Sequence, residues 1–318
     1  MKKCMIVIAA AALVMMMQSF AGNKKAPATK AELGKLLFFD PILSKDKKIS
    51  CASCHLPEHA FADTAAVSKG VAGRKGTRNT PSAMNVLLQR AFFWDGRAKT
   101  LEEQALKPIE NPVEMNLPVD SAVRRLQQNK LYADYFETVF KGSPTKENLA
   151  LAIAAFERTL ETSNSAFDEW KFSGKEDAVS DAVKRGFIVF NTKGKCIKCH
   201  FGADFANTND FRNIGIFDGR RFNDSGRMIV TGKPEDIGKF KVGSLRNVAV
   251  TALYMHNGMM KTLEEVIEFY NDTEKRIKHP NNKDTLLAKP LGLTDGEKKD
   301  LLEFLKALTD KRFITHRE

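Results

Sequence analysis

The sequence has 318 residues, of which 43% are hydrophobic, and its formal net charge is +11. This length suits two globular domains of ordinary size. Beyond the N-terminus, no apolar stretch approaches the ~20 residues of a membrane-spanning helix, so the mature chain is not expected to span a membrane. The basic excess predicts acidic partners or anionic surfaces. Nucleic acid is not expected, because the N-terminus predicts export from the cytoplasm.

Residues 1–21 have the pattern of a cleavable export signal. A pair of lysines is followed by a short apolar core at 6–17, and Ser19 and Ala21 are small residues at the positions that a signal peptidase reads. The apolar core is too short to span a bilayer. Cys4 precedes this core, so it would leave with the signal. We therefore expect a periplasmic protein cleaved after about Ala21.

Two short motifs repeat the pattern of a cysteine, two residues, a cysteine and a histidine. They occupy residues 51–55 and 196–200, and they contain four of the five cysteines. Two thiols at this spacing can form thioethers with the vinyl groups of a haem, and the adjacent imidazole can bind the iron. We therefore expect two covalently attached c-type haems, held by Cys51, Cys54 and His55 and by Cys196, Cys199 and His200.

Two other roles for these cysteines explain less of the pattern. Exported proteins often pair cysteines in disulfides, but disulfides leave His55 and His200 without a role. Zinc ribbons use two cysteine pairs about 15–20 residues apart, whereas these pairs are much farther apart. Haem attachment accounts for the cysteines and the histidines together.

Helical patterns dominate the rest of the chain. A short helix is predicted over residues 32–39, and an amphipathic helix over about 145–162. Capping-box patterns at Thr100, Thr262 and Thr294 each predict the start of a helix. Alternating strand patterns are scarce. We therefore expect a mostly α fold with two cytochrome-c-like haem domains and long loops.

A weak internal repeat is consistent with two related halves. Glycine followed by an apolar turn precedes each haem motif, at Gly34 and at Gly186, which we interpret as a helix lying close against a flat haem. Residues 163–180 are the predicted junction. The expected domains are an N-terminal peroxidatic domain at 22–165 and a C-terminal electron-transfer domain at 166–318, whose last helix could pack back on the first domain.

Two long loops are candidates for the walls of the haem pockets. They cover residues 62–80 and 201–243 and are rich in glycine and polar residues. Arg78, Arg97 and Arg246 are candidate partners for haem propionates, although each could equally be a surface charge.

In combination and order, the motifs of this chain resemble those of the bacterial di-haem cytochrome c peroxidase family over nearly the whole mature sequence. Besides the two haem motifs, the matching segments are residues 37–41, 78–81, 93–98, 101–104, 113–116, 245–247 and 254–258. The resemblance implies that peroxide reacts at the N-terminal haem and that the C-terminal haem supplies electrons.

The resemblance also implies roles for residues outside the haem motifs. His55 matches the proximal ligand of the reactive haem, Glu114 the distal acid–base residue, and Gln104 its neighbour in the pocket. Trp94 matches a residue between the haems that helps electrons to cross. A carboxyl above the iron can move a proton between the two peroxide oxygens if burial tunes its pKa.

A calcium ion between the domains is a further implication of the resemblance. Asn79, Thr251 and Leu253 match its ligands. Leu253 replaces a common proline, but that ligand is the backbone carbonyl, so the substitution still permits a calcium site.

One departure from the family pattern concerns the first haem. Many members carry a histidine that blocks the reactive iron until reduction removes it, and Val71 stands in that register here. Residues 68–78 contain no histidine. His59 follows His55 too closely to reach the opposite haem face. We therefore expect a first iron that is open, or bound by water, in the oxidised protein.

A second departure concerns the far ligand of the second haem. Tyr270 stands where the family usually has methionine, and this tyrosine resembles the enzyme that matures the quinone of methylamine dehydrogenase. A phenolate favours more oxidised iron, whereas a thioether favours Fe(II). Met255, Met259 and Met260 stay open as rival ligands, since spacing alone does not choose among them.

The expected function is reduction of hydrogen peroxide to water with electrons from reduced cytochrome c or a similar small protein. One alternative is a peroxide-driven oxidase of aromatic residues in a partner protein, but Gly194 replaces the tryptophan that the maturation enzyme uses. The other alternative is a non-catalytic di-haem electron carrier. Lys193, Lys195 and Lys198 could dock an acidic donor or form a solvated face, and a homodimer is allowed.

Overall fold

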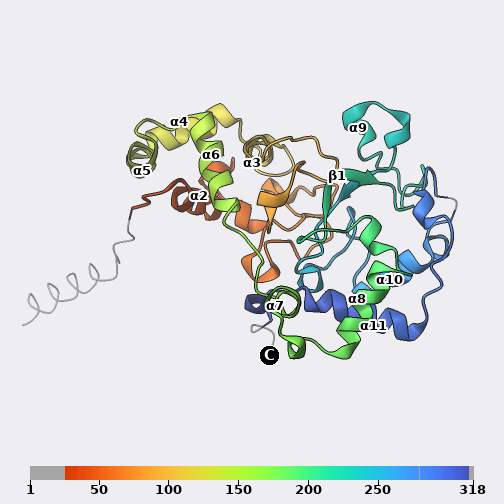
Figure 1. The fold of residues 1–318 in the computed structure, drawn as a ribbon. Helices are drawn as coiled ribbons and strands as arrows, with labels where there is room; N and C mark the ends of the chain where they lie inside the picture. Colours follow the sequence, from red (N-terminus) through yellow and green to blue (C-terminus); the bar gives the residue numbers. More distant parts are fainter. Residues whose placement is uncertain (1–25, 279, 315–318) are drawn as a thin grey trace, which may run out of the picture.

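The computed structural model describes residues 26–278 and 280–314 (Figure 1). The predicted export signal lies outside the described residues. Within the described ranges, no helix is long and apolar enough to cross a membrane. The structure is rich in helices and has little sheet, which confirms the prediction of a mostly α fold.

The N-terminal half contains a group of helices that packs around one hydrophobic core. Its members are α2 (Lys30–Phe39), α3 (Leu101–Glu110), α4 (Val119–Gln128), α5 (Lys130–Phe140) and α6 (Lys146–Glu157). Helix α2 begins at a complete capping box, in which Thr29 and Glu32 bind each other's backbone N–H groups. Leu33 and Leu37 then face the core and are fully buried.

The C-terminal half has its own core, rich in phenylalanine. Its helices are α7 (Ala166–Ser173), α8 (Asp181–Asn191), α9 (Met228–Thr231), α10 (Leu263–Asn271) and α11 (Asp295–Ala307). Strands β1 (Asn207–Arg212) and β2 (Phe240–Val242) form a two-stranded antiparallel sheet. In Figure 1 this sheet and the long loops lie between the two groups of helices.

The glycines of the internal repeat permit close helix crossings. A Cβ atom on Gly34 of α2 would lie 1.8 Å from the carbonyl oxygen of Ala152 in α6. The same atom on Gly186 of α8 would lie 1.9 Å from the carbonyl oxygen of Asp300 in α11. The close approach that these glycines permit is therefore to another helix, and the prediction that their helices lie against the haems stays a prediction. Each removes a side chain where two helix backbones meet.

The predicted helix over 145–162 ends earlier than its apolar pattern suggests. Helix α6 stops at Glu157, yet Leu160 is still buried. Leu160 lies in a non-helical segment tied to Asn85, whose backbone N–H donates to the Leu160 carbonyl at 2.7 Å. The apolar spacing therefore continued past the end of the helix, because both segments face the same interior.

Polar and apolar contacts join the two halves. The Arg78 guanidinium binds Asp224 across the sequence at 2.7 Å, and the Lys241 N–H donates to the Trp94 carbonyl at 2.8 Å. After α11, Phe313 packs into a cluster with Phe38 of the N-terminal half. The predicted division at residue 165 stays a prediction.

Candidate functional site

The first haem motif lines a cavity of about 440 Å³ in the N-terminal half. Cys51 begins a short 3-10 turn, Cys54 ends it, and the His55 N–H donates to the Cys51 carbonyl at 2.9 Å. This turn brings both thiols and the imidazole to one wall of the cavity.

The His55 ring is oriented by the backbone. Its Nδ1–H donates to the Phe61 carbonyl at 2.9 Å, and burial lowers the imidazole pKa. A neutral ring held at Nδ1 leaves Nε2 available to a metal ion. His200 has the same arrangement, with Nδ1 near the carbonyls of Phe205 at 3.1 Å and Gly243 at 3.2 Å.

The carboxyl group predicted from the family pattern lines the first cavity as well. Glu114 lies in the turn after α3, where its N–H donates to the Asn111 carbonyl at 3.0 Å. The Asn111 amide donates to Glu114 Oε1 at 2.7 Å. Burial raises the pKa of Glu114, partly offset by the Asn111 hydrogen bond and the Arg97 charge. Gln104, on α3, lines the same cavity.

The loop that carries Val71, in the register where many family members have a histidine, is held beside Glu114. The Val71 N–H donates to the Glu114 carbonyl at 2.8 Å, and Gly70 packs against the backbone of Glu114. Val71 is buried, and His59 does not line the cavity. Among the described residues, His55 is the only histidine that lines it.

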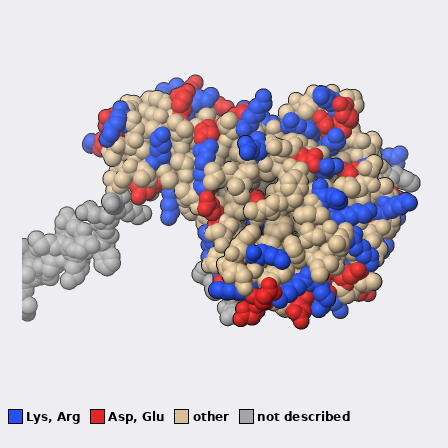
Figure 2. Space-filling view, viewed as in Figure 1, with Lys and Arg blue, Asp and Glu red and all other residues tan. Residues whose placement is uncertain are grey.

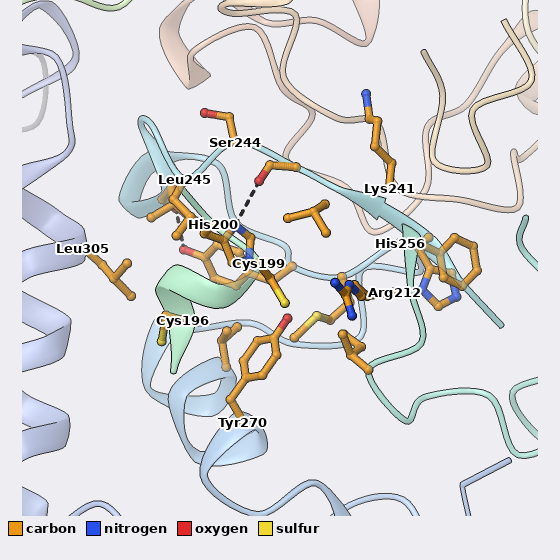
Figure 3. A pocket seen from close by; sticks show the side chains of 18 of the residues that line it. Cys196, Cys199, His200, Arg212, Lys241, Ser244, Leu245, His256, Tyr270 and Leu305 are labelled. Atoms are coloured by element: carbon orange, nitrogen blue, oxygen red, sulfur yellow. Dashed lines mark hydrogen bonds between the residues drawn. The ribbon is translucent and has the colours of Figure 1, made fainter. Parts of the chain in front are cut away.

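The second haem motif lines a separate cavity of about 310 Å³. Figure 3 shows Cys196, Cys199 and His200 on one side and Tyr270 of α10 opposite, with its hydroxyl directed into the cavity. Burial strongly raises the pKa of the Tyr270 phenol. A metal ion would have to lower that pKa for the phenolate to form.

The structure separates the rival methionines. Met255 lines the second cavity, whereas Met259 and Met260 do not. Met260 is fully buried in a cluster with Ile216 and Phe269. Tyr270 and Met255 are therefore the candidates that reach this site.

A shared wall separates the two cavities. Trp94 lines both, and its indole N–H donates to the Asn79 carbonyl at 2.8 Å. Lys241 also lines both cavities, and Glu157 lines the first. Sequence reasoning missed these two residues. In the strand Phe240–Val242 the two flanking residues are buried, so alternation predicts that the Lys241 side chain faces solvent. Glu157 belongs to a helical pattern that gave no indication of a cavity.

The predicted calcium ligands, Asn79, Thr251 and Leu253, all line the second cavity, and of the three only Asn79 also lines the first. The Asn79 amide nitrogen donates to the Ala65 and Ala66 carbonyls at 3.2 and 3.3 Å. The described residues form no group of three or more His, Cys, Asp and Glu side chains that could hold a metal. Calcium here would therefore rely on neutral oxygen ligands.

The candidate propionate partners have protein partners. Arg78 pairs with Asp95 at 2.6 Å, and Arg246 pairs with Asp168 at 2.8 Å. Arg97 binds Asp95 at 3.0 Å and lines the first cavity. Of the three, Arg97 is the most exposed, so its guanidinium is the freest to meet a ligand.

The residues present fit two c-type haems. Each cavity combines a pair of thiols three positions apart with a buried imidazole whose Nδ1 is already occupied. The second cavity is mostly apolar around them, as a flat hydrophobic macrocycle requires. Neither pair of cysteines forms a disulfide.

Known proteins are similar to this chain in both sequence and fold. The sequence profile of di-haem cytochrome c peroxidase matches residues 28–177. Cytochrome-c peroxidase IdrP1 of Denitromonas iodatirespirans is 36% identical over 91% of this chain and 84% of its own. Methylamine utilization protein MauG of Methylophilus methylotrophus is 36% identical over 88% of this chain and 82% of its own. The crystal structure of a MauG-like protein associated with microbial copper homeostasis superimposes with a TM-score of 0.81, at 33% identity and 90% coverage of both chains. This chain therefore belongs to the di-haem cytochrome c peroxidase family.

Proposed function

We propose that this protein is a periplasmic di-haem peroxidase that reduces hydrogen peroxide to water with electrons from reduced cytochrome c or a similar small donor. The observation that carries the proposal is the first cavity. It places Glu114 and Gln104 in one chamber with Cys51, Cys54 and His55, and His55 is the only histidine of the described residues in that chamber.

The side chains of the first cavity can manage the proton. A haem bound by Cys51, Cys54 and His55 would supply an iron that binds peroxide and exchanges electrons. Cleavage of the O–O bond needs a proton moved from the inner oxygen to the outer one. Glu114 can accept that proton and return it, because burial brings its pKa closer to neutral. The Asn111 hydrogen bond to Oε1 fixes the carboxyl while Oε2 does the transfer. Gln104 can orient the oxygens.

The second cavity supports electron supply. Cys196, Cys199 and His200 would hold a second haem, with Tyr270 as the far ligand. Trp94 lines both cavities, which supports a role for its ring in passing electrons between the two sites. A calcium ion held by Asn79, Thr251 and Leu253 would stiffen the wall of the second cavity.

The donor would dock near the second motif. Lys193 is paired with Glu297 at 2.7 Å, so Lys195 and Lys198 are better placed to meet an acidic partner. Phe201, which follows His200, is 46% exposed and adds apolar contact area. Figure 2 shows Lys and Arg interspersed with Asp and Glu over the visible face, so we expect this attraction to be local.

A second candidate function is oxidation of aromatic residues in a partner protein. The position of Tyr270 in the second cavity favours it, as does the similarity to MauG. Gly194 in the wall of that cavity weighs against it. At this position the maturation enzyme uses a tryptophan to draw electrons from its protein substrate, and glycine has no aromatic side chain to do so.

The test is peroxide-dependent oxidation of a reduced cytochrome c by the purified holoprotein. We expect steady turnover by the wild type and a loss of about 10²–10⁴-fold in Glu114→Gln, with the haem content unchanged. Equal rates in both proteins would exclude Glu114 as the acid–base group. No turnover with any donor would favour an electron carrier.

A further inference from the structure

Lys241 is a part-buried cation with no ion-pair partner among the described residues. Its ammonium group donates to the Gln89 amide oxygen and to the Ala91 carbonyl, the latter at 2.9 Å. None of the ion pairs formed within the described ranges includes Lys241. Two neutral acceptors leave one N–H of the ammonium unused and its charge uncompensated.

The surroundings of Lys241 make it unfavourable to hold its positive charge without an anionic partner. Burial lowers its pKa to about 8, and the opposing charge that acts on it is the more distant Asp204. Asp204 is already bound through Oδ1 by Asn85 at 2.6 Å and by Ser244 at 2.8 Å. A charge withdrawn from water is normally paired, so an anion from outside the chain would stabilise the Lys241 ammonium.

The position of Lys241 indicates where that anion lies. The residue keeps some accessible surface, and that surface lines the two haem cavities. Figure 3 shows its side chain leaving β2 and carrying the amine away from Cys199, His200 and Tyr270. The acceptors of the amine, Gln89 and Ala91, belong to the N-terminal half. The ammonium therefore points from β2 toward the N-terminal half, which contains the first cavity.

We propose that Lys241 binds a propionate of the first haem and thereby raises the reduction potential of that haem relative to a site without the cation. The inference rests on the proposed presence of haem in both cavities. A positive charge beside the macrocycle stabilises the reduced state, because reduction adds a negative charge. Since the backbone N–H of Lys241 also holds the Trp94 carbonyl, the same residue fixes the wall between the cavities.

The experiment is a spectroelectrochemical titration of both haems in the holoprotein, comparing wild type with Lys241→Gln. Glutamine keeps a polar N–H group on a side chain of similar size, but it carries no charge. We expect the one-electron reduction equilibrium of the first haem to shift about tenfold toward the oxidised state, which equals about 59 mV, with a smaller shift at the second haem. Lys241→Arg should keep the wild-type potential.

The matched control is Lys239→Gln. Lys239 lies just before β2, pairs with Asp236 at 3.1 Å and lines neither cavity. The same loss of charge there should leave both potentials unchanged. If Lys241→Gln does not fold, Lys241→Met offers the same comparison with the apolar stem retained.

Two failures are distinguishable. A wild-type protein that carries fewer than two haems, counted from the absorbance of their pyridine adducts, would overturn the proposed function. Two haems with an unchanged first potential in Lys241→Gln, or an equal shift in Lys239→Gln, would overturn the role of Lys241 alone.

Discussion

Glu157 provides a sharp test of the chemistry inside the first cavity. It lies at the end of α6, is only 7% exposed, and its Oε2 atom has no hydrogen-bond partner among the described residues. The neighbouring Arg158 pairs with Glu102 at 2.7 Å instead. Burial therefore raises the pKa of Glu157 to about 8. The perturbation is Glu157→Gln, which keeps the shape of the side chain and removes its titratable carboxyl group.

The magnitude follows from proton linkage. The ordinary pKa of this carboxyl is 4.5. Between that value and about 8, the folded protein keeps a proton that the unfolded chain releases. The free energy of unfolding of the wild type therefore falls as pH rises, by about 1.4 kcal/mol per pH unit from this group. From about pH 5.5 to about pH 7.5 the loss is roughly 2.5 kcal/mol, because the slope is smaller near each of the two pKa values. A glutamine side chain does not titrate, so the free energy of unfolding of the variant lacks this pH-dependent contribution.

The assay is urea unfolding at both pH values, followed by far-ultraviolet circular dichroism, with covalent haem retained throughout. The stability of Glu157→Gln relative to wild type should rise by about 2–3 kcal/mol between the lower and the higher pH. Glu161→Gln is the control, because Glu161 is exposed just beyond the same helix. A difference between wild type and Glu157→Gln that is the same at both pH values would refute the buried, protonated carboxyl.

Two further predictions concern packing and ligation. Gly34→Ala and Gly186→Ala should each lower the free energy of unfolding by about 2 kcal/mol or more, because the added methyl meets the backbone of the crossing helix. Gly142→Ala is the control, since its methyl would meet no atom within 4 Å, and equal urea midpoints for all three variants would contradict the helix-crossing role. Tyr270→Phe should alter the oxidised absorption and magnetic circular dichroism spectra of the second haem, whereas Met255→Leu should not. The reverse result would make Met255 the far ligand.

The chemistry of the sites was readable because it is local in sequence. A haem motif needs two cysteines and a histidine within five consecutive positions, so it can be recognised without knowledge of the fold. Helix starts were equally local, as the complete capping box at Thr294 shows. Glu114 could be assigned only by its resemblance to a family pattern, since an isolated glutamate in a loop has no diagnostic spacing.

Features that depend on distant partners could not be read in this way. Gly34 and Gly186 indicated a repeat, but the sequence could not show which helix each one crosses, because that helix lies more than a hundred residues away. The sequence could not show that Arg246, a candidate propionate partner, pairs with Asp168. Lys241 has the alternation of a surface residue, and only the tertiary arrangement shows that its exposed face is the inside of two cavities.

The most direct test of the central claim is the reaction of the fully oxidised holoprotein with one equivalent of hydrogen peroxide. With Val71 in the register of the blocking histidine, and only His55 among the described histidines lining the first cavity, the first iron should be open. The Soret spectrum should therefore change on mixing and the peroxide should be consumed without prior reduction. An unchanged spectrum in the oxidised protein, with reaction only after reduction, would contradict the account.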